Sequence, residues 1–129
     1  ILMAGYSKYD TIPNILSTCA FFVIKNNWKC TYGNVFETLV EMYCKNTEMK
    51  HILFTSPFLW EDKLVDFNMW LVVWLFITIR VPIYFVLAIP ISDKELEYKN
   101  KFGTDALETL FEKESIDIFD INRKSIVWL

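Results

Sequence analysis

Residues 69–91 form an apolar run with a single charge, Arg80, and no other stretch limits the fold so strongly. The run is long enough for a membrane-spanning helix, which needs about 20 apolar residues. Arg80 at its centre would cost about 2.5–3.5 kcal/mol on insertion, and Pro82 removes a helical hydrogen bond. Because valine and isoleucine favour strands, the run predicts two buried strands, Leu71–Ile79 and Ile83–Ile89, with Arg80–Pro82 as the bend. The alternative is a small membrane protein anchored by residues 69–91.

The composition is that of one folded domain. The chain has 129 residues, of which 53% are hydrophobic and 17% aromatic, so apolar material for a single core is available. Three glycines and four prolines are too few for a low-complexity chain. The sequence begins at Ile1 and lacks the basic region, short apolar run and cleavage site of a secretory signal, so we expect no such signal.

Negative charge is concentrated in one part of the chain. The net charge is −3, but residues 93–121 hold nine acids and four lysines, a local net of −5. An acidic surface of this kind disfavours nucleic acid as a ligand. It suits a basic protein partner, although a solvated face without a partner would have the same composition.

The cysteines and the one histidine do not form a recognisable metal or catalytic pattern. Cys19, Cys30 and Cys44 are odd in number, and their spacing fits neither a C-x-x-C pair nor a zinc ribbon. Separate thiols indicate a reducing compartment, so we expect a cytoplasmic protein. His51 stands without a second histidine or a nearby cysteine, which favours a structural role. The sequence therefore predicts no metal and no cofactor.

Four further segments predict secondary structure. Cys19–Lys25 has the composition of a buried strand, and Lys50–Ser56 predicts a strand that Pro57 stops. Asn34–Lys45 has apolar residues at helical spacing and predicts a helix. Pro57–Lys63 is expected to be a loop or the end of a strand.

A strand-to-helix junction follows the apolar run. Ser92 and Glu95 have the spacing of a capping box, and Ile91 and Leu96 that of a hydrophobic staple. Gly103 is placed to end the helix in a left-handed conformation. A second helix should then begin, with Thr104 as its cap and with Ala106, Leu107, Leu110 and Phe111 on one face. We expect Ser92 and Gly103 to shape the fold rather than to touch a partner.

Glu108 and Glu112 are the candidate partner-binding residues. They lie one turn apart on the predicted second helix, on its polar side and away from Leu107 and Phe111. Two carboxylates in this arrangement can meet a basic partner. We therefore expect their charge reversal to weaken binding and to leave stability almost unchanged.

Arg123 is predicted to have a structural role. It follows the apolar residues Ile118, Phe119 and Ile121, where the chain returns to the core. Its planar guanidinium favours a two-pronged contact, either with Asp120 three residues earlier or with carbonyls at a helix end. The alternative is an exposed arginine.

Three segments, His51–Asp62, Leu87–Phe111 and Ile116–Val127, resemble the suppressor of fused family in its bacterial form. The recurring pattern is a strand ending in Pro-Ile, a polar cap, a helix start of E-x-E type, Gly-x-x-Ala-Leu and a closing Asp-x-x-Arg-x-Ser-Val segment. Its positions here are Pro90, Ile91, Glu95, Glu97, Gly103, Ala106, Leu107, Asp120, Arg123 and Ser125, with Ile126 inserted before Val127. The resemblance is strongest over residues 46–127, and Gly5–Thr11 matches an earlier, weaker motif.

The resemblance implies one α+β domain over residues 1–129, with a mixed or antiparallel sheet packed against helices. The family has further strands at its amino end, which predicts a truncated copy, and the apolar insertion at about 68–85 is outside its pattern. The eukaryotic member binds and sequesters zinc-finger transcription factors of Hedgehog signalling. Bacterial relatives resemble immunity proteins, which neutralise a cognate toxin by binding it. The resemblance implies no enzymatic activity.

The leading prediction is therefore a non-enzymatic, immunity-type protein with a protein partner, plausibly a basic toxin domain. An enzyme is the weaker alternative, since the chain has no G-x-S-x-G, no P-loop and no H-E-x-x-H motif. Glu61 and Asp62 are adjacent, and on a strand they would point to opposite faces and could not act as a pair.

Overall fold

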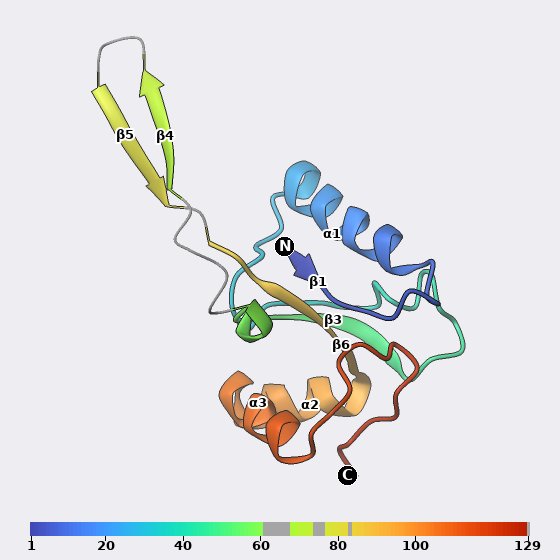
Figure 1. The fold of residues 1–129 in the computed structure, drawn as a ribbon. Helices are drawn as coiled ribbons and strands as arrows, with labels where there is room; N and C mark the ends of the chain where they lie inside the picture. The colour runs from blue at the N-terminus through green and yellow to red at the C-terminus, as the bar shows by residue number, and fades with distance from the viewer. Residues whose placement is uncertain (61–67, 74–76, 83, 129) are drawn as a thin grey trace.

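The computed structural model describes residues 1–60, 68–73, 77–82 and 84–128. Its helices are α1, α2 and α3, together with the 3-10 turn η1, and its strands are β1 to β6 (Figure 1). In chain order, the elements are β1 (Leu2–Met3), α1 (Ile12–Asn26), β2 (Val35–Phe36), β3 (Met49–Thr55), η1 (Phe58–Trp60), β4 (Asn68–Val73), β5 (Ile77–Pro82), β6 (Leu87–Ser92), α2 (Asp93–Phe102) and α3 (Thr104–Lys113).

The main sheet has four strands in the order β1-β6-β3-β2. β1 runs parallel to β6, and the other pairs are antiparallel, so the sheet is mixed. In its centre, Leu53 of β3 stands opposite Ile89 of β6. A mixed sheet with helices packed on it confirms the predicted α+β class.

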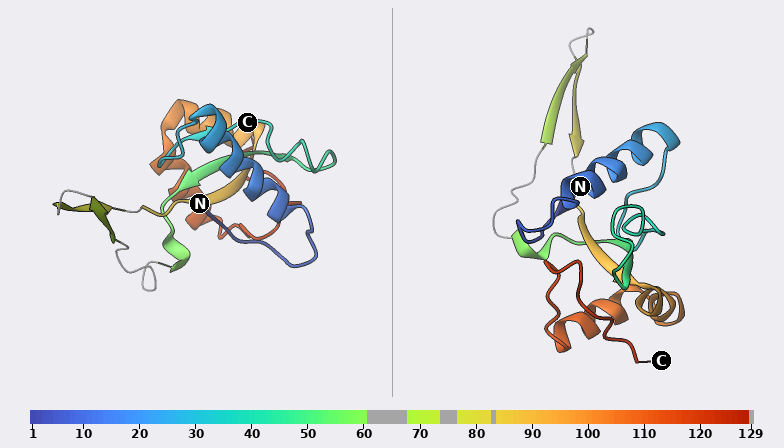
Figure 2. Two further views of the ribbon diagram at one scale, coloured as in Figure 1. Left: turned by 90° about the horizontal axis from the view of Figure 1, so that it is seen from above. Right: turned by 90° about the vertical axis from the view of Figure 1, so that its right-hand side faces the viewer.

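Helices cover both faces of this sheet, with α1 on one side and α2 and α3 on the other (Figure 2). Successive residues of β3 point to opposite faces of the sheet. Ile52 and Phe54 pack with the α1 residue Ile15, whereas Leu53 packs with Leu107 of α3. Because a strand covered on both faces needs no polar side, residues 52–54 of β3 and 87–91 of β6 are all apolar and buried.

The apolar run at 69–91 forms strands, as predicted, but there are three of them and their limits differ. The chain reverses between Val73 and Ile77, which pair across the β4–β5 hairpin, so the predicted strand Leu71–Ile79 is wrong. The predicted bend at Arg80–Pro82 is also wrong, because these residues lie in β5. Pro82 ends that strand, a position where its missing N–H is tolerated. β6 begins only at Leu87.

The burial predicted for this run can be followed from residue 84 onward. The six residues of β6 are all buried, but Tyr84, inside the predicted buried strand Ile83–Ile89, is 83% exposed, so the predicted burial is wrong there. The burial of the β4 and β5 side chains, like the placement of Ile83, lies outside the described residues. The alternative of a membrane anchor requires a long apolar helix. In the part of the chain that the structure describes, no helix is long and apolar enough to cross a membrane.

Cys19–Lys25 was predicted as a strand, which is wrong, because these residues belong to α1. The buried residues Ile15 and Cys19 are one helical turn apart and face the sheet. Phe21 and Ile24 lie on the outer side and are 54% and 75% exposed. Apolar residues on both sides of the helix hide its 3.6-residue period, which explains the error.

Asn34–Lys45 was predicted as a helix, which is also wrong. The segment contains β2 and a series of turns. Its backbone makes a few turn bonds of its own, but it is also tied to β3, since the Val40 N–H donates to the Lys50 carbonyl at 3.0 Å. Thr38 has a φ of 57°, which no helix interior allows. Leu39 and Val40 are buried. The apolar residues of this segment therefore indicated burial correctly, but their spacing did not indicate a helix.

The strand predicted at Lys50–Ser56 is β3, displaced by one residue. After Pro57 the chain forms the short η1 turn rather than a loop or a strand end. The remainder of Pro57–Lys63, including Glu61 and Asp62, lies outside the described residues.

Candidate partner-binding site

The capping box at the start of α2 is present. The Ser92 hydroxyl accepts a hydrogen bond from the Glu95 N–H at 3.2 Å, and the Glu95 carboxylate accepts one from the Ser92 N–H at 3.1 Å. Ile91 and Leu96, the predicted staple, pack in the same apolar cluster. The box fixes the direction in which α2 leaves the sheet.

Gly103 both ends α2 and caps α3. Its φ of 94° and ψ of 167° define a conformation that is open to glycine and strained for other residues. The ψ is extended, so this is not the left-handed helical conformation that the sequence suggested. Thr104 is already the first residue of α3, so its prediction as a helix cap is wrong.

We expect Ser92→Ala and Gly103→Ala to lower stability without weakening partner binding. Ser92→Ala removes a helix cap worth about 0.5–2 kcal/mol and a 2.8 Å hydrogen bond to Ser125. An alanine Cβ at Gly103 would meet no atom within 4 Å, so its loss of about 1–3 kcal/mol comes from backbone strain alone. Urea unfolding measures both losses, with the exposed Ser17→Ala as the control. A Ser92→Ala protein that unfolds normally but fails to bind would contradict this assignment.

Glu95 and Arg123 form a buried ion pair behind the junction. The two guanidinium nitrogens Nη1 and Nη2 lie 2.6 and 2.8 Å from Oε1 and Oε2 of Glu95. Nη2 also donates to the Pro90 carbonyl at 2.9 Å. Glu95 is fully buried and Arg123 is 9% exposed. The exposed alternative for Arg123 is therefore wrong, and so is its pairing with Asp120, because the first turn of α2 places Glu95 directly against the guanidinium.

Asp120 belongs to a different contact, which joins the two ends of the described chain. It accepts hydrogen bonds from the Tyr9 hydroxyl and from the Asn122 N–H, and the Tyr9 bond is the main reason that the pKa of Asp120 lies below its usual value. The Tyr6 hydroxyl donates to Asp117 at 2.6 Å. We call Tyr6, Tyr9, Asp117 and Asp120 the tyrosine clasp. It places the weaker motif, residues 5–11, beside the closing motif.

His51 is held as a structural residue. It is 4% exposed. Its Nδ1 accepts the Thr38 N–H at 2.9 Å, and its Nε2 donates to Asp93 at 2.8 Å. Asp93 also accepts a hydrogen bond from Lys50, and these bonds from Lys50 and His51 hold the pKa of Asp93 below its usual value. Both ring nitrogens of His51 are thus engaged in structural hydrogen bonds.

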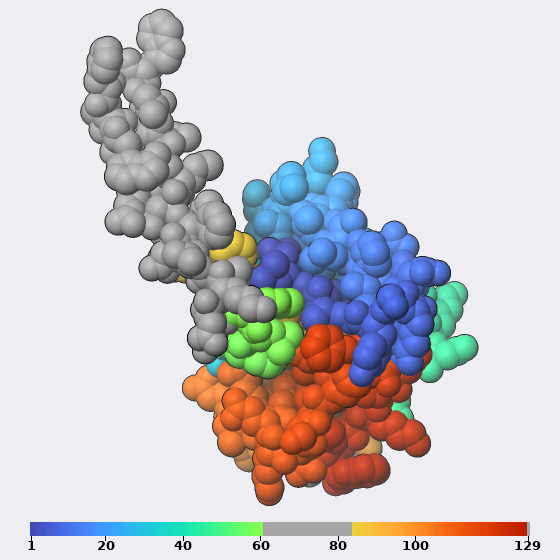
Figure 3. Space-filling model, in the orientation of Figure 1, coloured from blue at the N-terminus to red at the C-terminus, as the bar shows by residue number. Residues whose placement is uncertain are grey.

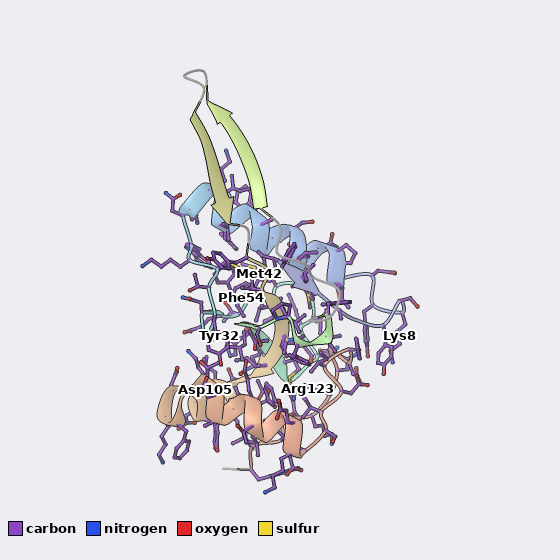
Figure 4. The ribbon with its side chains drawn as sticks, turned by 60° about the vertical axis from the view of Figure 1, so that its left-hand side comes forward. Lys8, Tyr32, Met42, Phe54, Asp105 and Arg123 are labelled. Atoms are coloured by element: carbon purple, nitrogen blue, oxygen red, sulfur yellow. The ribbon has the colours of Figure 1, made fainter. Side chains whose placement is uncertain are left out.

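The two predicted partner-binding acids on α3 have different environments. Glu108 is half-buried, and its carboxylate accepts hydrogen bonds from the hydroxyls of Thr55 and, at 2.8 Å, Tyr32. Burial raises the pKa of Glu108. Tyr32 also reaches Asp105, as Figure 4 shows. Glu112 is exposed, and its carboxylate has no hydrogen-bonding partner among the residues that the structure describes. Glu112 is therefore the freer of the two for a contact.

A pocket of about 440 Å³ lies beside these acids. It is enclosed by η1, by α3 and by residues 115–119, which meet on the face shown in Figure 3. Glu108 and Glu112 line one side of it. Its apolar lining is made by Phe58, Leu59, Ile89, Phe111, Ile116, Ile118 and Phe119.

The pocket is connected to both structural contacts described above. The Arg123 guanidinium stands over the Phe111 ring, 5.4 Å from its centre, a favourable cation–π arrangement. The Tyr6 N–H donates to the Phe119 carbonyl. Arg123 of the ion pair thus packs against the Phe111 wall of the pocket, and Tyr6 of the tyrosine clasp holds the Phe119 wall.

The sequence model of the suppressor of fused protein family matches residues 1–124. The chain belongs to the suppressor of fused family. It is 43% identical over 129 residues to the immunity protein YqcF of Bacillus subtilis, covering 98% of this chain and 62% of the relative. It also resembles the crystal structure of a suppressor of fused homologue from Neisseria gonorrhoeae, with a TM-score of 0.66 and 21% identity. That match covers 91% of this chain and 57% of the other, and it shows a shared fold.

In this suppressor of fused family member, the polar cap and the closing segment of the family pattern meet at Glu95 and Arg123. Both residues stood out in the sequence, but nothing in their spacing joined them. Tyr32 and the pocket were missed altogether, because a lone tyrosine in a turn carries no signal for a contact with α3. The tyrosines at 6 and 9 were noticed only as part of a motif.

Proposed function

We propose that this protein is an immunity-type protein that neutralises a cognate protein toxin by direct binding, in the cytoplasm and without catalysis. The observation that carries the proposal is the exposed acid Glu112 beside an apolar pocket, on α3. A relative that is 43% identical is named an immunity protein, which supports the same role. The chain spans 62% of that relative's length, so this role is a proposal for the chain.

The partner that this surface suits is a basic protein. Residues 93–121 have a net charge of −5, and a field of that sign attracts basic partners and repels nucleic acid. Complementary charge mainly raises the association rate. The association rate of the complex should therefore fall as the salt concentration rises.

The absence of catalysis is part of the proposal. A catalytic site needs a nucleophile or base with a free acceptor atom. His51, the only histidine of the chain, has both ring nitrogens engaged in structural hydrogen bonds. Binding alone accounts for the surface described above.

Co-expression in a bacterial host tests the function. The probe is a toxin-like carboxy-terminal domain of a large secreted protein, to be sought in the open reading frames that neighbour the gene of this chain. We expect the domain alone to stop growth, and co-expression of this chain to restore it while the two proteins co-purify. Growth arrest that persists with the chain well expressed and folded would overturn the proposal.

Charge reversal separates the two acids. We expect Glu112→Lys to weaken toxin binding by roughly threefold to tenfold, which corresponds to about 0.7–1.4 kcal/mol, and to leave the melting temperature unchanged. Glu108→Lys should lower both the affinity for the toxin and the melting temperature, because it breaks the hydrogen bonds to Thr55 and Tyr32. Calorimetric titration and thermal unfolding measure the two effects. Glu37→Lys, an equal charge change at an exposed site near β2, is the control.

A further inference from the structure

The pocket between η1, α3 and residues 115–119 combines two features that point to one kind of occupant. Its lining is largely apolar and includes the rings of Phe111 and Phe119. Glu108 and Glu112 stand on the same side, both contributed by α3. Burial in an apolar cavity is favourable for a large aliphatic or aromatic side chain. A carboxylate at the edge of the cavity stabilises a neighbouring cation.

We propose that this pocket receives an anchor from the partner protein, made of a large apolar side chain with a lysine or arginine next to it. This inference rests on the proposed function and adds to it the site and the chemistry of the contact. Buried aromatic or aliphatic anchors carry most of the energy in protein interfaces. A volume of about 440 Å³ is at the low end for ligand pockets and suits a few side chains.

The two acids have different roles in the pocket. Glu108 is fixed by Thr55 and Tyr32, so it shapes the wall and keeps a preformed orientation. Glu112 is exposed and unpaired among the described residues, so it meets the partner's cation. The apolar wall on the other side is held by the Tyr6 contact to Phe119. A pocket with fixed walls binds without a cost of rearrangement.

Methyl NMR with short peptides tests the inference independently of any toxin. Isoleucine methyl groups are labelled, because Ile89, Ile116 and Ile118 line the pocket whereas Ile15 and Ile52 pack on the opposite face of the sheet. The probe is the capped peptide Lys-Leu-Trp-Lys. Its matched controls are Glu-Leu-Trp-Glu, which reverses the charge, and Lys-Ser-Gly-Lys, which lacks the anchor.

We expect Lys-Leu-Trp-Lys to shift the three pocket methyls and to leave Ile15 and Ile52 unmoved. The acidic peptide should bind roughly tenfold more weakly, and the anchorless one should produce no shift. Glu112→Lys should remove the preference for the basic peptide. Ser56→Trp, which places a ring at the mouth from an exposed position, should block all three shifts in a protein that melts normally.

Three results would overturn the inference. One is the absence of pocket shifts at saturating peptide, and another is equal binding of all three peptides. The third is a shift of the pocket methyls with protein concentration alone, which would make a second copy of this chain the occupant. If the peptides fail while growth protection holds, the proposed function stands and only the pocket assignment falls. If growth protection fails while the peptides bind, the pocket still takes a basic apolar anchor, but the proposed function falls and with it the assignment of that anchor to a toxin.

Discussion

Glu95→Ala is expected to lower the free energy of unfolding by about 3–5 kcal/mol, because it leaves the buried Arg123 charge without its partner. Glu95 is fully buried and accepts hydrogen bonds from Nη1 and Nη2 of Arg123 as well as from the backbone N–H of Ile126, at 3.2 Å. The loss is a large share of the 5–15 kcal/mol that holds a typical domain together. Denaturant unfolding followed by circular dichroism measures it.

Two companion variants identify the cause. Glu97→Ala removes an exposed carboxylate from the same helix and should change stability by less than about 0.5 kcal/mol. Arg123→Lys keeps the charge but not the planar fork, so it should lower the melting temperature by a smaller amount than Glu95→Ala. Equal stability of Glu95→Ala and Glu97→Ala would show that the pair contributes nothing.

Phe54→Ala should cost about 3–5 kcal/mol by opening a cavity on the α1 side of the sheet. The Phe54 side chain is fully buried. Its ring packs edge-on against the Phe36 ring, with 4.7 Å between the ring centres. The Phe36 ring in turn packs against Trp28, with 4.8 Å between their ring centres. Removal of the ring therefore takes a direct contact from Phe36, on which Trp28 packs in turn. Thermal and urea unfolding measure the effect.

Phe21→Ala is the matched control for this change. It deletes the same side chain from α1, where the ring is 54% exposed, so little apolar contact is lost. If Phe54→Ala does not fold, Phe54→Leu should still show an intermediate loss. A Phe54→Ala protein as stable as Phe21→Ala would mean that the aromatic cluster does not hold α1 to the sheet.

Local signals were sufficient where the structure obeys local rules. The Ser92–Glu95 capping box depends on residues three apart, and the end of α2 depends on the conformational freedom of Gly103. Both could be predicted without knowing the rest of the fold. The strand β3 was recognisable for the same reason, since a short apolar run before Pro57 has few other solutions.

Elsewhere the prediction from sequence failed because tertiary contacts determine the local structure. Periodicity failed in α1 because Phe21 and Ile24 are apolar yet exposed, and it failed at residues 34–45 because β3 captures the backbone of that segment. For Arg123 the sequence suggested either Asp120, three residues away, or carbonyls at a helix end, but its carboxylate partner Glu95 lies 28 residues away. The acids on α3 were found, whereas Tyr32 and the apolar pocket could emerge only from the folded chain.

The distance along the chain between Glu95 and Arg123 also orders the events of biosynthesis. A ribosome produces the β6–α2 junction well before the residue that neutralises it, so the nascent chain carries a carboxylate that it cannot yet bury. We expect the junction to stay solvated and the chain to be a chaperone client until Arg123 has emerged, after which the domain closes in one step. Ribosome-bound chains extended by a short linker that keeps residue 123 inside the exit tunnel, or by a longer linker that lets it emerge, should differ sharply in protease resistance. The emergence of Arg123, rather than helix formation, would then time the appearance of a competent binding surface.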